Sequence, residues 1–140
     1  MDSQVDNANK TRILIVDDHA HLREAIAILI NMENDFSVCG EADSIPLALD
    51  LYDSLRPDLV LIDISLKGEN GLDLLKQLVQ YTPPACCVVF SLHDEAHYIE
   101  TARTAGARGY AIKSGGAQGL LPCLRQVRNG INNFASPGQS

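Results

Sequence analysis

Residues 59–63 read LVLID, and residues 13–18 read ILIVDD. Each stretch is a short, continuous apolar run that ends in aspartate. That pattern is typical of a parallel strand buried on both faces. A third run, CCVVF at residues 86–90, ends at Ser91. We therefore predict that these three segments form the centre of a parallel sheet.

Helical patterns separate the predicted strands. Apolar residues recur there at intervals of three and four, which is the period of a helix with one buried face. The predicted helices contain residues 22–30, 47–55, 72–79, 98–102 and 121–127, and two weaker strands cover residues 37–42 and 109–112. Five strands alternating with five helices predict an α/β fold. We expect a flavodoxin-like (βα)5 architecture, with a doubly wound, five-stranded parallel sheet in the order 2-1-3-4-5.

Length and composition favour one globular domain. The chain has 140 residues, of which 46% are hydrophobic and 21% charged. Residues 1–11 lack periodicity, so we expect a disordered N-terminal tail followed by a domain over residues 12–130. The four cysteines lack the spacing of metal ligands and are expected to be reduced, buried thiols.

The net charge of −7 argues against nonspecific binding to nucleic acid or to an anionic membrane, because both require a positive field. It suits a protein that holds a cation. No apolar run approaches the roughly 20 residues that cross a bilayer. Residues 1–10 also lack the pattern of a signal peptide. We therefore expect a cytoplasmic protein.

Chemically active side chains follow four of the predicted strands: Asp17, Asp18, Asp63, Ser91 and Lys113. In an open parallel sheet, ligands bind outside the carboxyl ends of the strands. Carboxylates brought together there repel one another unless a cation lies between them. Oxygen ligands favour Mg²⁺, so the sequence predicts a magnesium site at this edge.

Carboxylates, Mg²⁺, a hydroxyl and a lysine are the parts of a phosphoryl-transfer site. Asp63 ends the central strand and is the best candidate for the nucleophile, while Asp17 and Asp18 would hold the metal. Taken alone, Asp18 has the alternative interpretation of a helix cap, and Lys113 that of a solvated charge. Their coincidence at four strand ends favours a site.

Three histidines, His19, His21 and His93, also fall near this edge. Histidine clusters can bind transition metals. The first two are two residues apart, which does not place them on the same face of a helix. We therefore expect residues on the rim of the site and not a dedicated histidine metal site.

At these residues the sequence resembles the receiver domain of bacterial two-component response regulators. The similarity covers residues 12–130 and rests on the motifs ILIVDDH, LVLIDISLKGENGLDLL, VVFSLHDE and GARGYAIKSG. The residues within these motifs are most similar to those of the NarL/FixJ subfamily of transcription regulators.

The resemblance implies that Asp63 accepts a phosphoryl group from a sensor histidine kinase or a phosphotransfer protein. It implies that Mg²⁺ is held by Asp17, Asp18, Asp63 and the backbone carbonyl of Ser65. The chain would then be a signalling domain that catalyses its own phosphorylation and dephosphorylation.

The resemblance also implies roles for three further residues. Lys113 would pair with the phosphoryl oxygens, and Ser91 would move to hydrogen-bond one of them. Tyr110 would be the switch aromatic, turning inward when Ser91 shifts and coupling the site to the surface.

Four residues depart from the pattern of the family or are unusual within it. Lys67 and Ser114 stand where many receivers have proline, which leaves the rigidity of one loop and the isomer of one peptide bond open. Leu92 is bulky and could narrow phosphate access. Because a proline inside a helix costs about 3 kcal/mol, we expect the last helix to begin near Leu120 or Leu121, with Pro122 in its first turn.

Residues 131–140, INNFASPGQS, resemble the start of a linker to a DNA-binding helix-turn-helix that this chain lacks. An excised receiver is expected in preference to a stand-alone one. DNA binding is expected only through the absent output domain. A phosphorylation-dependent homodimer is a further expectation from the resemblance.

Two other classes of function remain to be weighed. A receiver-like interaction module that does not use phosphate is disfavoured by the intact set of acidic residues, Ser91 and Lys113. A metabolic enzyme or a flavodoxin would need a hydroxyl- and glycine-rich phosphate loop after the first strand, where this chain has DDHAHL.

Overall fold

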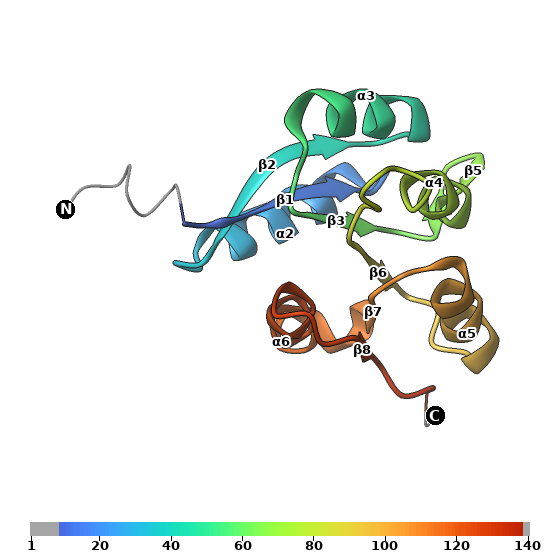
Figure 1. The fold of residues 1–140 in the computed structure, drawn as a ribbon. Helices are drawn as coiled ribbons and strands as arrows, with labels where there is room; N and C mark the ends of the chain where they lie inside the picture. Colours follow the sequence, from blue (N-terminus) through green and yellow to red (C-terminus); the bar gives the residue numbers. More distant parts are fainter. Residues whose placement is uncertain (1–8, 139–140) are drawn as a thin grey trace.

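The computed structural model describes residues 9–138, so most of the predicted N-terminal tail lies outside the described residues. The main sheet consists of β1 (Thr11–Val16), β2 (Phe36–Ala42), β3 (Leu59–Ile62), β6 (Cys87–Ser91), β7 (Gly109–Ile112) and β8 (Asn133–Phe134). The helices are α2 (Ala20–Asn31), α3 (Ile45–Leu55), α4 (Gly71–Leu78), α5 (Ala96–Ala105) and α6 (Gly116–Arg128). Strands and helices alternate along the chain as predicted (Figure 1).

The strand order is β2-β1-β3-β6-β7-β8, and all neighbouring strands are parallel. The first five strands have the predicted order 2-1-3-4-5, so the doubly wound, flavodoxin-like fold is confirmed. The sixth strand was not predicted. β1 begins at Thr11, one residue before the predicted start of the domain, because Thr11 already pairs with Phe36.

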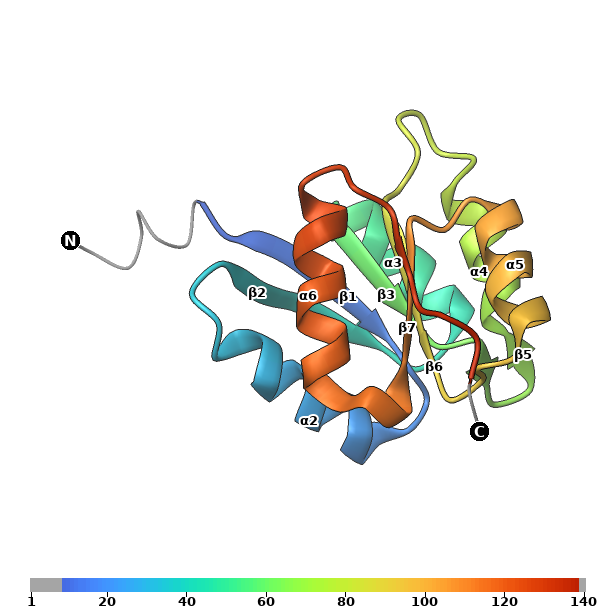
Figure 2. The same cartoon turned by 90° about the horizontal axis from the view of Figure 1, so that it is seen from below.

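The sheet is covered on both faces. Helices α2 and α6 pack on one face, and α3, α4 and α5 pack on the other (Figures 1 and 2). Along β1, Ile13 and Ile15 are buried under the first pair of helices, whereas Leu14 and Val16 are buried under the other three. Burying one such side chain contributes about 1.5–3 kcal/mol. The apolar runs are continuous because both faces of each central strand lie in a core.

Helix α6 begins earlier than predicted. A 3-10 turn, Lys113–Gly115, leads directly into the helix at Gly116, so Pro122 lies in the helix interior and not in its first turn. Pro122 lacks the N–H that would bond to the carbonyl of Gln118. Both residues are exposed, so water can solvate that carbonyl. The helix is held by a buried face of Leu120, Cys123, Leu124 and Val127.

The chain after α6 returns to the sheet as strand β8. The N–H of Asn133 donates to the carbonyl of Arg108 at 3.1 Å, and the N–H of Ala135 donates to the carbonyl of Tyr110 at 2.9 Å. In Figure 2 this segment runs beside β7, between α6 and α5. The packed part of the chain therefore continues past residue 130, the predicted end of the domain. A linker and an output domain beyond it stay a prediction.

Two further contacts attach this C-terminal segment to the face that carries α5. The guanidinium of Arg103 lies 4.0 Å from the ring centroid of Phe134. The N–H of Gly138 donates to the carbonyl of Asp94 at 2.8 Å. Residues 133–138 therefore join β7 to the loop between β6 and α5.

All four cysteines are free thiols. Cys87 and Cys123 are buried, and burial raises the pKa of Cys123 to about 11. Cys39 and Cys86 are only partly buried, unlike the prediction. Cys86 and Cys87 face opposite sides of the sheet, as expected for neighbouring residues in an extended segment.

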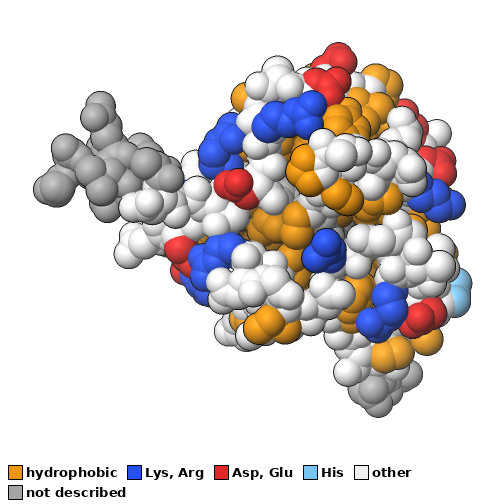
Figure 3. Space-filling view, in the orientation of Figure 1, with side chains coloured by type: hydrophobic (Ala, Val, Ile, Leu, Met, Phe, Trp, Pro, Cys, Tyr) orange, Lys and Arg blue, Asp and Glu red, His pale blue; other side chains and the backbone are white. Residues whose placement is uncertain are grey.

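None of the helices described for residues 9–138 combines the length and the apolarity that crossing a membrane requires. On the face drawn in Figure 3, the basic and acidic side chains lie in small mixed groups rather than in one continuous basic area.

Candidate functional site

The predicted site residues meet at the carboxyl edge of the sheet. Asp17 follows β1, Asp63 follows β3, and Lys113 follows β7. The ammonium Nζ of Lys113 lies 2.9 Å from Asp17 Oδ2 and 2.9 Å from Asp63 Oδ2. Lys113 is 96 positions from Asp17 and 50 positions from Asp63 in the sequence. The fold brings these three side chains together because parallel strands end at one edge of the sheet.

The ion pairs of Lys113 are shielded from solvent. The side chains of Lys113, Asp17 and Asp63 are only 6%, 3% and 4% exposed. Burial raises the pKa of Asp63, and the hydrogen bond from Lys113 opposes that rise. Burial alone would lower the pKa of Lys113, but its bonds to Asp63 and Asp17 outweigh burial and raise it. Lys113 is therefore a charged, buried partner of two carboxylates.

Asp17 is held from several sides. Its Oδ1 accepts the backbone N–H of His19 at 2.9 Å, while its Oδ2 faces Lys113. Its backbone carbonyl accepts Nη1 of Arg23 at 2.6 Å, and Arg23 is itself paired with Glu41 at 2.9 Å. The bonds from His19 and Lys113 orient the Asp17 carboxylate, and Arg23 holds the backbone of the same residue.

Asp18 leaves one buried oxygen without a hydrogen bond. Among residues 9–138, Asp18 Oδ1 is the buried side-chain polar atom that lacks a hydrogen-bond partner. Oxygens of Asp17, Asp18 and Asp63 lie within 4.8 Å of one another. Two of the three carboxylates share one buried ammonium, and the remaining negative charge, together with the oxygen that lacks a hydrogen bond, fits a divalent cation. The metal site predicted from the sequence has suitable residues.

A short hairpin shapes the loop that follows Asp63. The strands β4 (Ser65–Leu66) and β5 (Glu69–Asn70) pair in antiparallel fashion, and Lys67 and Gly68 form the turn between them, with Gly68 at φ +73°. The hairpin orders this loop although Lys67 stands where many receivers have proline. The direction of the Ser65 carbonyl toward a metal stays a prediction, while the Ser65 N–H donates to Asp63 Oδ1 at 3.1 Å.

Gly71 lets this loop close against the site. Its N–H donates to the carbonyl of Ile64 at 2.7 Å. A Cβ atom on Gly71 would lie 2.0 Å from the backbone carbonyl oxygen of Asp63. Only glycine fits at this approach, so Gly71 helps to set the position of Asp63. Gly71 was not predicted as a residue of the site.

The opposite side of the site is formed by the loop after β6. Ser91 is fully buried, and its hydroxyl oxygen accepts the N–H of His93 at 3.1 Å. Nε2 of His93 shares a hydrogen bond with Oγ of Ser65 at 2.9 Å, and its ring stacks on Tyr98. The side chain of Leu92 points outward and is 71% exposed, so it does not fill the site.

Tyr110 is fully buried in this structure. Its hydroxyl donates to the carbonyl of His93 at 2.6 Å, and burial raises its pKa to about 12. The ring therefore already occupies the inward position that the sequence analysis associated with switching. The Lys113–Ser114 peptide bond is trans, since Thr82–Pro83 is the cis bond found among residues 9–138.

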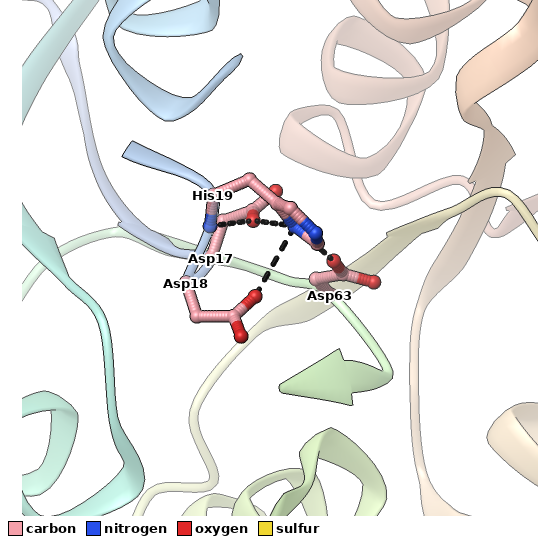
Figure 4. A group of neighbouring side chains, drawn as sticks. All are labelled: Asp17, Asp18, His19 and Asp63. Carbon is pink, nitrogen blue, oxygen red and sulfur yellow. Dashed lines mark hydrogen bonds and ion pairs between the residues drawn. The ribbon is translucent and has the colours of Figure 1, made fainter. Parts of the chain in front are cut away.

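His19 reaches the carboxylates. Its Nδ1 lies 3.1 Å from Asp17 Oδ1, 3.1 Å from Asp18 Oδ1 and 3.9 Å from Asp63 Oδ2 (Figure 4). The side chain is 62% exposed, which agrees with the predicted place on the rim, but its ring nitrogen belongs to the acidic cluster. His21 is exposed and lies outside that cluster.

Comparison with known proteins identifies the family of this chain. The family model of the response regulator receiver domain matches residues 13–125. The chain belongs to this family. It is 37% identical over 124 residues to the nitrate/nitrite response regulator protein NarL of Escherichia coli K12, covering 89% of this chain and 57% of NarL. It is 33% identical over 130 residues to the transcriptional regulatory protein DegU of Brevibacillus brevis, covering 93% of this chain and 55% of DegU.

Solved structures agree with this assignment. A LuxR-family two-component response regulator from an Aurantimonas species matches with a TM-score of 0.85 and 30% identity, covering 91% of each chain. The response regulator domain of CheB from Thermotoga maritima matches with a TM-score of 0.78 and 27% identity, covering 86% of this chain and 97% of that one. The receiver domain spans about half the length of the curated relatives it matches. The predicted receiver domain and its NarL-type subfamily are confirmed.

Proposed function

We propose that this receiver domain accepts a phosphoryl group on Asp63 in a reaction that requires Mg²⁺. The donor would be the phosphohistidine of a sensor histidine kinase or of a phosphotransfer protein. The P–N bond of the donor breaks, a P–O bond to an Asp63 carboxylate oxygen forms, and the histidine leaves. The observation that carries this proposal is the cluster of three carboxylates in which Asp17 and Asp63 share the buried ammonium of Lys113 and Asp18 keeps an oxygen without a hydrogen bond.

The metal would be held by Asp17, Asp18, Asp63 and the backbone carbonyl of Ser65. When bound, Mg²⁺ supplies positive charge that neutralises phosphoryl oxygens and so favours attack by a carboxylate. The backbone N–H of Ser65 orients the Asp63 carboxylate, since it donates to Oδ1. The contacts of the Asp17 carboxylate with the N–H of His19 and with Lys113 keep it directed toward the same space.

Lys113 and Ser91 would stabilise the transferred group. The ammonium of Lys113 already lies 2.9 Å from Asp63 Oδ2, so a short movement would bring it to a phosphoryl oxygen. Ser91 would turn its hydroxyl from the N–H of His93 to donate to another phosphoryl oxygen. The same arrangement would later admit water for dephosphorylation, which the domain would also promote.

His93 connects the site to the switch residue. Its N–H is bonded to Ser91, and its carbonyl accepts the hydroxyl of Tyr110. A shift of Ser91 toward a phosphoryl group would therefore change the hydrogen bonds of Tyr110. We propose that this change controls transcription through a helix-turn-helix outside this chain, with a homodimer as a further step. Free thiols fit the reducing cytoplasm as the place of action.

Intact-mass spectrometry tests the proposal. The wild-type chain is incubated with acetyl phosphate in the presence and absence of Mg²⁺, beside Asp63→Asn and the exposed control Asp73→Asn. We expect one phosphoryl adduct that needs Mg²⁺, is absent in Asp63→Asn and is retained in Asp73→Asn. An adduct that persists in Asp63→Asn would refute the acceptor, and a wild-type chain that neither binds Mg²⁺ nor forms an adduct would indicate a phosphorylation-independent interaction module.

A further inference from the structure

We infer that Nδ1 of His19 is a ligand of the metal ion in this site and tunes it toward transition-metal ions such as Mn²⁺ and Co²⁺. The inference rests on the metal site of the proposed function and concerns which ions that site selects. Carboxylates and water suit Mg²⁺, whereas an imidazole nitrogen suits first-row transition metals. His19 would therefore raise the affinity for those metals and leave the affinity for Mg²⁺ little changed.

The separations between the donor atoms match those around one ion. Ligands about 2.1 Å from an octahedral ion lie roughly 3.0 Å apart when adjacent and about 4.2 Å apart when opposite. Nδ1 of His19 lies 3.1 Å from an oxygen of Asp17, 3.1 Å from an oxygen of Asp18 and 3.9 Å from an oxygen of Asp63. The donor atoms of all four residues lie within 4.8 Å of one another, so they must draw together to contact the same ion.

The backbone directs the imidazole toward this point. His19 is the residue before α2, with extended backbone, and its N–H is bonded to Asp17 Oδ1 at 2.9 Å. Within the described part of the chain, its side chain makes no hydrogen bond that caps the helix. The contacts that the ring does make are with the carboxylates (Figure 4). A role toward a cation therefore explains its direction better than a role in capping.

Lys113 leaves this position free. The two carboxylate oxygens of Asp17 have different partners: Oδ2 is bonded to Lys113, and Oδ1 faces His19. The buried Oδ1 of Asp18, which has no hydrogen bond among the described residues, also faces His19 at 3.1 Å. An ion beside His19 would thus meet oxygens of Asp17 and Asp18 that Lys113 does not use, and it would share Oδ2 of Asp63 with Lys113. The exposed side of the imidazole leaves the ion open to water or a phosphoryl oxygen.

Electron spin-echo spectroscopy of bound Mn²⁺ tests the ligand directly. Modulation from a coordinated ¹⁴N is expected in the wild-type protein and in His21→Gln, whose exposed histidine lies outside the cluster. It is expected to disappear in His19→Gln, which still binds Mn²⁺ through the carboxylates. Absence of the modulation from the wild type, or its survival in His19→Gln, would overturn the inference.

Calorimetric titration tests the metal preference. His19→Gln should weaken Co²⁺ binding by about tenfold or more, since even the loss of a residue that merely supports a ligand has an effect of this size. Mg²⁺ binding should change little, whereas Asp18→Asn should weaken both ions. Equal losses of Co²⁺ and Mg²⁺ in His19→Gln, or Co²⁺ binding that survives in Asp18→Asn, would contradict the inference. A nitrogen ligand without a phosphoryl adduct would refute only the proposed function, and an adduct without the nitrogen ligand would refute only this inference.

Discussion

The two ends of the central sheet use buried and half-buried charges in opposite ways. At the carboxyl end, three carboxylates lie together, and among residues 9–138 the one lysine paired with them is Lys113, which contacts Asp17 and Asp63. At the amino end, two acidic and two basic side chains pair with one another: Glu33, Asp35, Arg125 and Arg128. The first group has an excess of negative charge, and the second is balanced.

The balanced group fastens α6 to the loop before β2. Arg125 contacts Glu33 at 2.6 Å and Asp35 at 3.0 Å, and Arg128 contacts Asp35 at 2.5 Å. Both guanidinium groups also lie over the ring of Phe36. Paired charges at this end hold elements together, whereas the excess negative charge at the other end fits a cation. The balance between positive and negative charges therefore distinguishes the two clusters better than the number of charges does.

The largest effect should come from removing the single cation of the site. Lys113→Ala should lower the free energy of unfolding by about 3 kcal/mol in the absence of divalent ions, because breaking a buried pair leaves uncompensated charge. Urea unfolding at pH 7 measures the loss. Added Mg²⁺ should restore part of it, since it binds the folded state. A loss no larger than that of an exposed lysine such as Lys76→Ala would contradict the comparison.

A smaller loss should follow from the same kind of change at the amino end. Hydrogen bonds from Arg125 hold the pKa of Asp35 far below its usual value of 3.8. The folded protein thus binds this proton more weakly than the unfolded chain, so the stabilisation is present above pH 3.8 and is lost as the pH falls below it. Asp35→Asn should cost about 1 kcal/mol at pH 7, a value limited by partial exposure.

Thermal unfolding of the wild type and Asp35→Asn at pH 7, 5 and 3 checks this effect. The difference in melting temperature between the two proteins should shrink toward pH 3. A difference that stays constant would mean that the carboxylate charge of Asp35 does not hold the cluster together.

An effect on stability no larger than that of Asp35→Asn, but of opposite sign, is expected for Asp18. Asp18→Asn should raise the free energy of unfolding by about 1 kcal/mol without metal, because a neutral amide relieves the repulsion among three carboxylates. The same variant should lose Mg²⁺ affinity. Urea unfolding together with calorimetric titration measures both changes. If Asp18→Asn were destabilising like Asp35→Asn, the contrast between the two ends would fail.

Local pattern was sufficient to predict that Asp17, Asp63 and Lys113 lie at one edge of the sheet. Asp17 and Asp63 follow continuous apolar runs, and Lys113 follows a weaker one, so each was placed at a strand end. Parallel strands then bring those ends together without further information. The contact of Lys113 with both carboxylates follows from the fold and not from its neighbours in sequence.

Other features depend on contacts that no local pattern reveals. β8 has only two residues in a polar segment, and it exists because β7 offers unpaired backbone groups. Helix α6 starts at Gly116 despite nearby glycines, since its buried face is held by the sheet. The spacing of His19 from His21 predicted a residue on the rim of the site. The direction of the His19 side chain is instead set by the bond from its backbone N–H to Asp17.

Strand β8 also bears on the solubility of the domain. An open edge of a sheet exposes unpaired backbone groups that can template pairing with a second molecule. β8 occupies that position beside β7. The edge strand at the other side, β2, contains a register shift opposite Ile13 and Leu14, and its Val38 N–H is taken by the side chain of Asn31. Both edges are thus poor templates for β-aggregation.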